Sequence, residues 1–116
     1  MTIHYLEIVT PDIGAVCATY ERVHGLSFGP ALPALGQARV AQLPGGGRLG
    51  VRSPLSAEEG PIVRAYLRVA DVDAAARAAE ASGAVIALPS TELAGEGKIA
   101  IFIQGGIQHG VWQPPE

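Results

Sequence analysis

The sequence predicts an α+β fold built from two βαβββ modules. The order of one strand, one helix and three further strands occurs twice along the chain. Three pairs of landmarks recur in register about 60 residues apart, namely Asp12 and Asp71, Gly25 and Gly83, and Gly50 and Gly110. The 116 residues suffice for one domain with a modest core. We assign module one to residues 1–53, a linker to 54–61 and module two to 62–116.

In module one, the alternating segment IHYLEIV indicates a strand, and Pro- and Gly-rich segments separate the later elements. The following helix is bounded by Thr10, which can cap it, and by Gly25, which can end it. The predicted elements are a strand at 3–9, a helix at 10–25, a short edge strand with a loop at 26–36, and a hairpin of strands 37–43 and 48–53 around PGGG.

Module two repeats this order. Asp71 is the expected cap of its helix, and Gly83 the expected end. The predicted elements are a strand at 62–69, a helix at 70–83, a strand at 84–90, and a hairpin of strands 97–104 and 106–113 that turns at GG.

Composition excludes several classes of protein. The net charge of −3, with acids and bases interspersed, does not indicate the basic patch that nucleic-acid binding requires. No apolar run is long enough for a membrane span, and the first residues lack the basic region of a signal peptide. The single cysteine, Cys17, permits no intrachain disulfide. We therefore expect a cytoplasmic protein that binds neither nucleic acid nor membrane.

Two modules of this kind resemble the vicinal oxygen chelate superfamily, which includes glyoxalase I, extradiol dioxygenases and bleomycin-resistance proteins. LEIVTPDIGAVCATYERVHGLSF is similar to the family's strand, Asp, helix with a Tyr, and Gly. GKIAIFIQGGIQHGVWQ is similar to its closing hairpin, with Lys98 in place of the usual Arg. The resemblance spans the whole chain and implies a U-shaped open sheet with a concave binding side. It does not imply one activity, because the family includes isomerases, lyases, oxygenases and binding proteins.

The resemblance also indicates where a metal would be held. In the family's metal enzymes four equivalent positions carry the ligands, and in this sequence they are Tyr5, Gly50, Arg64 and Gly110. Glycine has no side chain, and arginine stays charged and cannot coordinate. We therefore expect no metal and no cofactor.

Strand alternation assigns the remaining side chains to two faces. In the last strand Gln108, Gly110 and Trp112 share one face, and the resemblance implies that this is the concave side, because Gly110 takes a ligand position. His109 then points toward the helices and is predicted to pack. The same reasoning places Lys98 and Phe102 on the concave side, and Ile99, Ile101 and Ile103 against the helix. The concave face then carries five of the eight basic residues and one of the eleven acids.

This charge pattern predicts a site for a small anion, held by guanidinium groups between aromatic walls. The predicted ligand-binding residues are Tyr5, Arg48, Arg52, Arg64, Tyr66, Arg68, Lys98, Phe102 and Trp112. An alternative is that Arg48, Arg52 and Arg68 lie near strand ends, in solvent or at a subunit contact. Glu7, the one acid on this face, either pairs with Arg64 or serves as a general base.

Two functions follow, together with a third possibility. The first is a metal-independent protein that binds a small anionic molecule, similar to the resistance proteins. The alternative is a lyase or isomerase that acts on a small carboxylated metabolite with Glu7 as the base, so the sequence does not decide whether the chain is an enzyme. A pure dimerisation module is the third. We expect a homodimer, because exposed sheet edges need to be covered.

Overall fold

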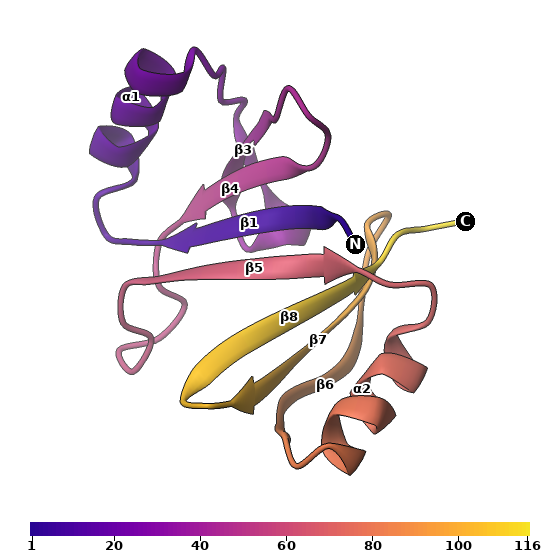
Figure 1. Cartoon of the computed structure of the whole chain (residues 1–116). Helices are drawn as coiled ribbons and strands as arrows, with labels where there is room; N and C mark the ends of the chain where they lie inside the picture. The colour runs from indigo at the N-terminus through magenta and orange to yellow at the C-terminus, as the bar shows by residue number, and fades with distance from the viewer. The chain divides into compact units, whose positions relative to one another are not determined.

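The computed structural model describes all 116 residues and contains two α-helices and eight strands (Figure 1). In chain order the elements are β1 (Ile3–Val9), α1 (Ile13–His24), β2 (Ala31–Leu32), the 3-10 helix η1 (Pro33–Leu35), β3 (Ala38–Gln42), β4 (Arg48–Arg52), β5 (Ile62–Arg68), α2 (Val72–Ala81), β6 (Val85–Leu93), β7 (Gly97–Gln104) and β8 (Ile107–Gln113). The βαβββ order occurs twice, which confirms the predicted α+β fold of two such modules. Neither helix combines the length and the apolar character that a membrane crossing requires.

The chain divides into two compact units. The N-terminal unit comprises Tyr5–Val63, and the C-terminal unit comprises Met1–His4 together with Arg64–Glu116. The first residues group with the C-terminal unit, where the backbone N–H of Arg68 donates to the carbonyl oxygen of Thr2 at 2.8 Å.

In the N-terminal unit the strands lie in the order β2-β3-β4-β1. β1 and β4 are parallel, whereas β3 is antiparallel to both β2 and β4. The helix α1 ends as predicted at Gly25, which adopts the left-handed conformation with φ of 67°. Its start differs from the prediction, because Asp12 takes the cap position and the Thr10 hydroxyl accepts only from the Asp12 N–H.

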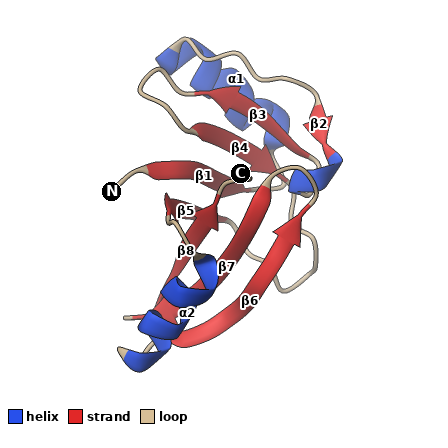
Figure 2. Ribbon diagram, turned by 90° about the vertical axis from the view of Figure 1, so that its right-hand side faces the viewer, coloured by secondary structure: helices blue, strands red, loops and turns tan.

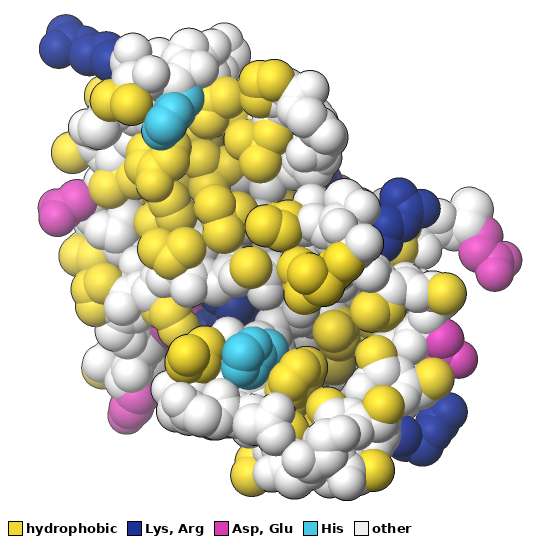
Figure 3. Space-filling view, viewed as in Figure 1, with side chains coloured by type: hydrophobic (Ala, Val, Ile, Leu, Met, Phe, Trp, Pro, Cys, Tyr) yellow, Lys and Arg dark blue, Asp and Glu magenta, His cyan; other side chains and the backbone are white.

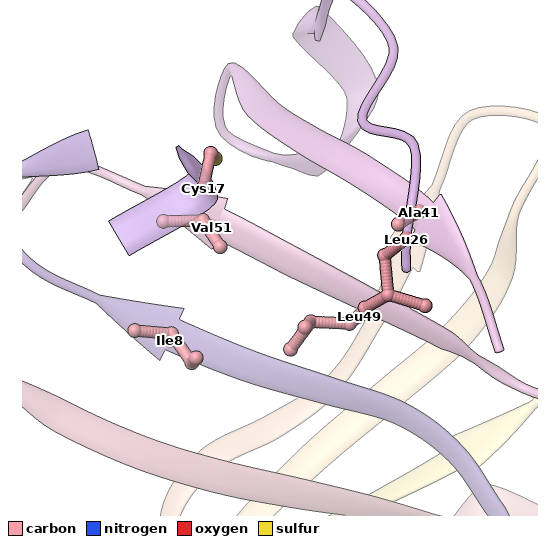
Figure 4. Close-up of a cluster of buried hydrophobic side chains, with 6 residues drawn as sticks. All are labelled: Ile8, Cys17, Leu26, Ala41, Leu49 and Val51. Atoms are coloured by element: carbon pink, nitrogen blue, oxygen red, sulfur yellow. The ribbon is translucent and has the colours of Figure 1, made fainter. Parts of the chain in front are cut away.

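The core of this unit lies between α1 and the sheet (Figure 4). Its buried members are Ile8, Cys17, Leu26, Ala41, Leu49 and Val51. The predicted faces of β1 and β4 are therefore confirmed, since Ile8, Leu49 and Val51 all point toward the helix. Burial raises the pKa of the Cys17 thiol, an effect that the nearby Arg39 partly opposes. Figure 3 shows further hydrophobic side chains gathered at the surface over this unit, in the upper part of the view.

In the C-terminal unit the strands lie in the order β5-β8-β7-β6, and α2 covers β6, β7 and β8 (Figure 2). Asp71 caps α2 as predicted, because its carboxylate accepts from the N–H of Ala74 at 3.1 Å. The side chain of Gln113 accepts from a second helix N–H, that of Val72, at 3.0 Å. The core beneath the helix consists of Val72, Ala100 and Val111, with Val69, Ala75 and Phe102 packed against them.

The outer strands of both units are poorly suited to pairing with another chain. β2 has only two residues and lies between Pro30 and Pro33. β6 contains Pro89 and two register shifts against β7. Prolines, short strands and bulges blunt a sheet edge, so these two edges give no reason of their own for a dimer.

Candidate functional site

In the N-terminal unit, Tyr5 occupies the space above Gly50. Tyr5 is buried on β1, and a Cβ atom added at Gly50 on the neighbouring β4 would overlap with the Tyr5 hydroxyl and ring. The guanidinium carbon of Arg48 lies 5.7 Å from the centre of the Tyr5 ring, within the range of a cation–π contact. The glycine at this position therefore makes room for a tyrosine of the same unit.

Beside this pair, Arg52 joins two glutamates. Its Nε donates to Glu7 Oε2 at 2.8 Å, and its Nη1 and Nη2 donate to the two carboxylate oxygens of Glu59 at 2.9 and 2.7 Å. Glu59 also accepts from the backbone N–H of Leu55, so it closes the segment that follows β4. The hydrogen bonds with Glu59 raise the pKa of Arg52 most, burial opposes the shift, and the hydrogen bond with Glu7 adds to the increase.

This network changes the roles predicted for Arg52 and Glu7. Arg52 is 6 % exposed and already bound to two carboxylates, so it is a poor anchor for an anionic ligand. Glu7 is 7 % exposed and forms an ion pair with Arg52 that engages one of its two oxygens. Sequence patterns did not single out Glu59, because a glutamate in a linker between strands resembles any solvated acid.

In the C-terminal unit, Arg64 forms the centre of a second polar cluster. Its Nε and Nη2 both donate to Gln108 Oε1, at 3.0 and 2.7 Å, and its Nη1 donates to the Tyr66 hydroxyl at 3.3 Å. Arg64 is 6 % exposed although it carries a permanent charge. The cluster joins β5 to β8 and holds a buried guanidinium within this unit.

An aromatic wall adjoins the Arg64 cluster. The Tyr66 ring meets Trp112 edge-on, with ring centroids 5.4 Å apart. The ring centroids of His4 and Trp112 are 5.1 Å apart. The indole N–H of Trp112 donates to the carbonyl oxygen of Glu96 at 2.7 Å, which fixes the ring against the β6–β7 turn. A Cβ atom added at Gly110 would overlap with the Tyr66 ring. Each unit thus has a tyrosine above one of the two glycines.

The predicted faces of β7 were wrong. Phe102 packs into the core beneath α2 and stacks on His109, with ring centroids 5.0 Å apart. Lys98 shares this face by alternation. Instead, Ile99, Ile101 and Ile103 lie opposite Trp112, Gly110 and Gln108 of β8 and share their face. The position predicted for His109 is correct, since it lies on the helix-covered side.

The remaining predicted residues lie apart from the Arg64 cluster. Arg68 lines an open cleft of about 470 Å³ beside Thr2 and Pro114. Lys98 lines a second cleft of about 630 Å³ on the other side of the last residues, beside Glu92. Neither cleft includes Arg64, Tyr66 or Trp112.

The residues at the family's metal positions do not fit a metal ion. Tyr5 packs over Gly50, and the Tyr66 ring fills the space over Gly110. Arg64 carries a permanent positive charge and cannot coordinate a cation. Elsewhere, no group of three or more His, Cys, Asp or Glu side chains is arranged to hold a metal.

The fold and this geometry define a two-module βαβββ protein with a polar cluster inside each unit. Among solved structures, it resembles methylmalonyl-CoA epimerase from Mycobacterium tuberculosis, with a TM-score of 0.74 and 17 % identity over 98 % of this chain and 88 % of that one. A hypothetical protein from Bacillus halodurans gives a TM-score of 0.76 and 16 % identity over 99 % and 95 % of the two chains. A variant of Streptomyces coelicolor methylmalonyl-CoA epimerase, in complex with 2-nitronate-propionyl-CoA, gives a TM-score of 0.67 and 16 % identity over 98 % of this chain and 97 % of that one. No protein-family model and no curated protein matches the chain. At these identities the likeness establishes the fold alone.

Proposed function

We propose that the chain is a metal-independent protein of the vicinal oxygen chelate superfamily that binds a small anionic molecule through Arg64. The likeness in fold to the epimerases supports the superfamily. The observation that carries the proposed function is the buried Arg64 guanidinium, bound to Gln108 and Tyr66 beside Trp112. A guanidinium donates to carboxylates and phosphates in a forked geometry, and a low-dielectric setting strengthens those bonds.

Metal independence is supported by packing as well as by residue type. A metal enzyme would need ligand side chains at Gly50 and Gly110, and tyrosine rings fill the space that such side chains would enter. In this proposal Arg64 and Tyr66 of the C-terminal unit take over the binding that a metal ion performs in the family's metal enzymes.

A lyase or isomerase with Glu7 as general base is the second candidate. It is supported by the solved structures, because several that this chain resembles are methylmalonyl-CoA epimerases. Arg52 Nε donates to Glu7 Oε2, so the ion pair engages one carboxylate oxygen that a general base would need. For this reason we rank binding above catalysis.

A thermal-shift and calorimetric screen with anionic metabolites tests the binding function. Arg64→Met should weaken the best ligand by about 10- to 100-fold, since a hydrogen bond to a charged group contributes roughly 1.5–3 kcal/mol. Arg77→Met is the matched control, because Arg77 is exposed on α2 of the same unit. Equal effects of the two variants would contradict the proposal.

Deuterium incorporation tests catalysis separately. Methylmalonyl-CoA is incubated with the protein in deuterated water, and exchange at the carbon next to the thioester is followed by mass spectrometry. Exchange that Glu7→Gln abolishes would establish the isomerase. Binding without exchange would leave the binding function in place.

We also propose a homodimer in the cytoplasm. The partly buried apolar side chains around the α1 core support the dimer, because a second copy would cover them. Cys17 supports a reducing compartment, since it is the single cysteine and a buried free thiol.

A further inference from the structure

Four side chains form a row across the sheet of the C-terminal unit. Arg64 on β5 contacts Gln108 on β8, Ile103 on β7 is the register partner of Gln108, and Val85 on β6 is the partner of Ile103. All four lie on the face away from α2. Exposure rises along the row from 6 % at Arg64 to 37 % at Ile103 and 65 % at Val85. The row therefore runs from a buried cation to an exposed apolar end.

Gln108 connects the two ends of this row. Its Oε1 accepts two hydrogen bonds from Arg64, and a guanidinium, which has only donors, would not tolerate the amide in the flipped orientation. The Nε2 donor is thereby turned away from Arg64, and no protein acceptor binds it. The hydrogen bonds with Arg64 thus orient the Gln108 side chain so that its Nε2 donor points out of the cluster, with the Arg64 guanidinium on the opposite side of the amide.

We propose that this row binds an aliphatic carboxylate. One carboxylate oxygen accepts from Gln108 Nε2 with the Arg64 charge behind it, and the alkyl chain lies across Ile103 and Val85. The inference rests on the proposed anion-binding function and names the ligand class for the same site. It also gives the exposed side chains of Ile103 and Val85 a function, because they would contact the alkyl chain, whereas a bare anion would not use them.

The spacing of the strands sets the length of the chain. Neighbouring strands lie about 4.8 Å apart, so β8 and β6 are separated by roughly 10 Å. A short- to medium-length alkyl chain spans this distance, whereas acetate ends before it reaches Ile103. Affinity should therefore rise along the series acetate, butyrate and hexanoate and then level off. Complete burial of a methylene group would raise affinity by about fourfold. The gain in affinity for each added methylene should therefore stay below about fourfold.

Calorimetric titration of the full chain with this series and with octanoate tests the inference, with hexanol as the uncharged control and inorganic phosphate as the bare anion. We expect hexanoate to bind at least tenfold more tightly than acetate, and hexanol to bind more weakly than hexanoate. Val85→Thr and Ile103→Thr should reduce the dependence on chain length and leave acetate unchanged. Gln108→Glu should weaken every carboxylate by tenfold or more, because the new charge pairs with Arg64 and repels the ligand.

Ile107→Thr is the matched control, since Ile107 is exposed on the helix side of the same hairpin and should change nothing. Equal affinities for acetate and hexanoate, or silent Val85→Thr and Ile103→Thr variants, would overturn the inference. If phosphate binds in an Arg64-dependent way and carboxylates do not, the inference fails and the proposed function stands. If no anion binds, the proposed function itself fails.

Discussion

Replacing Gly110 by alanine tests whether the Tyr66 ring fills the space above this glycine. The backbone of Gly110 is not left-handed, so alanine can adopt it without strain. The added methyl group would instead overlap with the Tyr66 ring. That ring cannot shift freely, because its hydroxyl accepts from Arg64 and its edge meets Trp112.

Two opposing effects decide the sign of the change. Glycine inside a strand is less stable than alanine by roughly 0.5–1 kcal/mol, so an unobstructed alanine would stabilise the fold. Extra atoms in a packed site cost about 1–3 kcal/mol. The overlap with an aromatic ring belongs at the upper end of that range, so Gly110→Ala should lower the free energy of unfolding by about 1–2 kcal/mol.

Equilibrium unfolding in urea measures this difference. Gly14→Ala is the control, because Gly14 lies on exposed α1 with no atom within 4 Å of an added Cβ, and it should stabilise slightly. In a Tyr66→Ala background, Gly110→Ala should become neutral or stabilising, which reports the coupling directly. A Gly110→Ala variant as stable as the wild type would refute the packing of Tyr66 over Gly110.

Four further predictions follow from the same structure. Elemental analysis of gently purified protein should find no stoichiometric divalent metal, and zinc, nickel or cobalt should not raise the melting temperature. About one metal ion per chain would contradict the conclusion that Tyr5, Gly50, Arg64 and Gly110 do not fit a metal. Arg52→Met should cost about 3–5 kcal/mol in urea unfolding, because it removes the cation that pairs with both Glu7 and Glu59, and Glu59→Gln should cost less, since that side chain is 21 % exposed. The raised pKa of Cys17 means that the folded thiol keeps its proton while the unfolded thiol ionises, so stability should fall as pH rises above about 9, and Cys17→Ala should lack this component; a native thiol that reacts rapidly with a disulfide reagent near neutral pH would contradict it. Light scattering at micromolar concentration should give a dimer, whereas a monomer would mean that the partly buried apolar side chains around the α1 core need no cover.

Sequence periodicity succeeded where one face of a strand is clearly more apolar than the other. In β4, Leu49 and Val51 alternate with two arginines and a glycine, and they pack under α1 as predicted. In β1, Ile8 packs there as well and alternates with Glu7. The helix boundaries at Gly25 and Asp71 were equally readable, because a left-handed glycine and a capping carboxylate are local signals.

Periodicity failed on β7, where both faces are apolar. The segment IAIFI offers three isoleucines on one face and alanine with phenylalanine on the other, so hydrophobicity does not identify the buried face. Hairpin register could have done so. A two-residue turn at Gly105 and Gly106 pairs Phe102 with His109, which places both on one face. The thin, alanine-rich α2 then accepts the phenylalanine.

These corrections change the chemistry expected of the site. The predicted concave face drew its selectivity from five basic residues, but Lys98 lies on the helix side, Arg52 is bound to two glutamates, and Arg68 lines a cleft of its own. Arg64 keeps the central position, now beside isoleucines that had been assigned to the core. For a ligand that contacts one buried cation and an apolar surface, a second negative charge adds little to the binding affinity, whereas an alkyl portion adds much. The ligand that we propose is therefore a monoanion with an apolar portion, which is a narrower class than the small anion predicted from the sequence pattern.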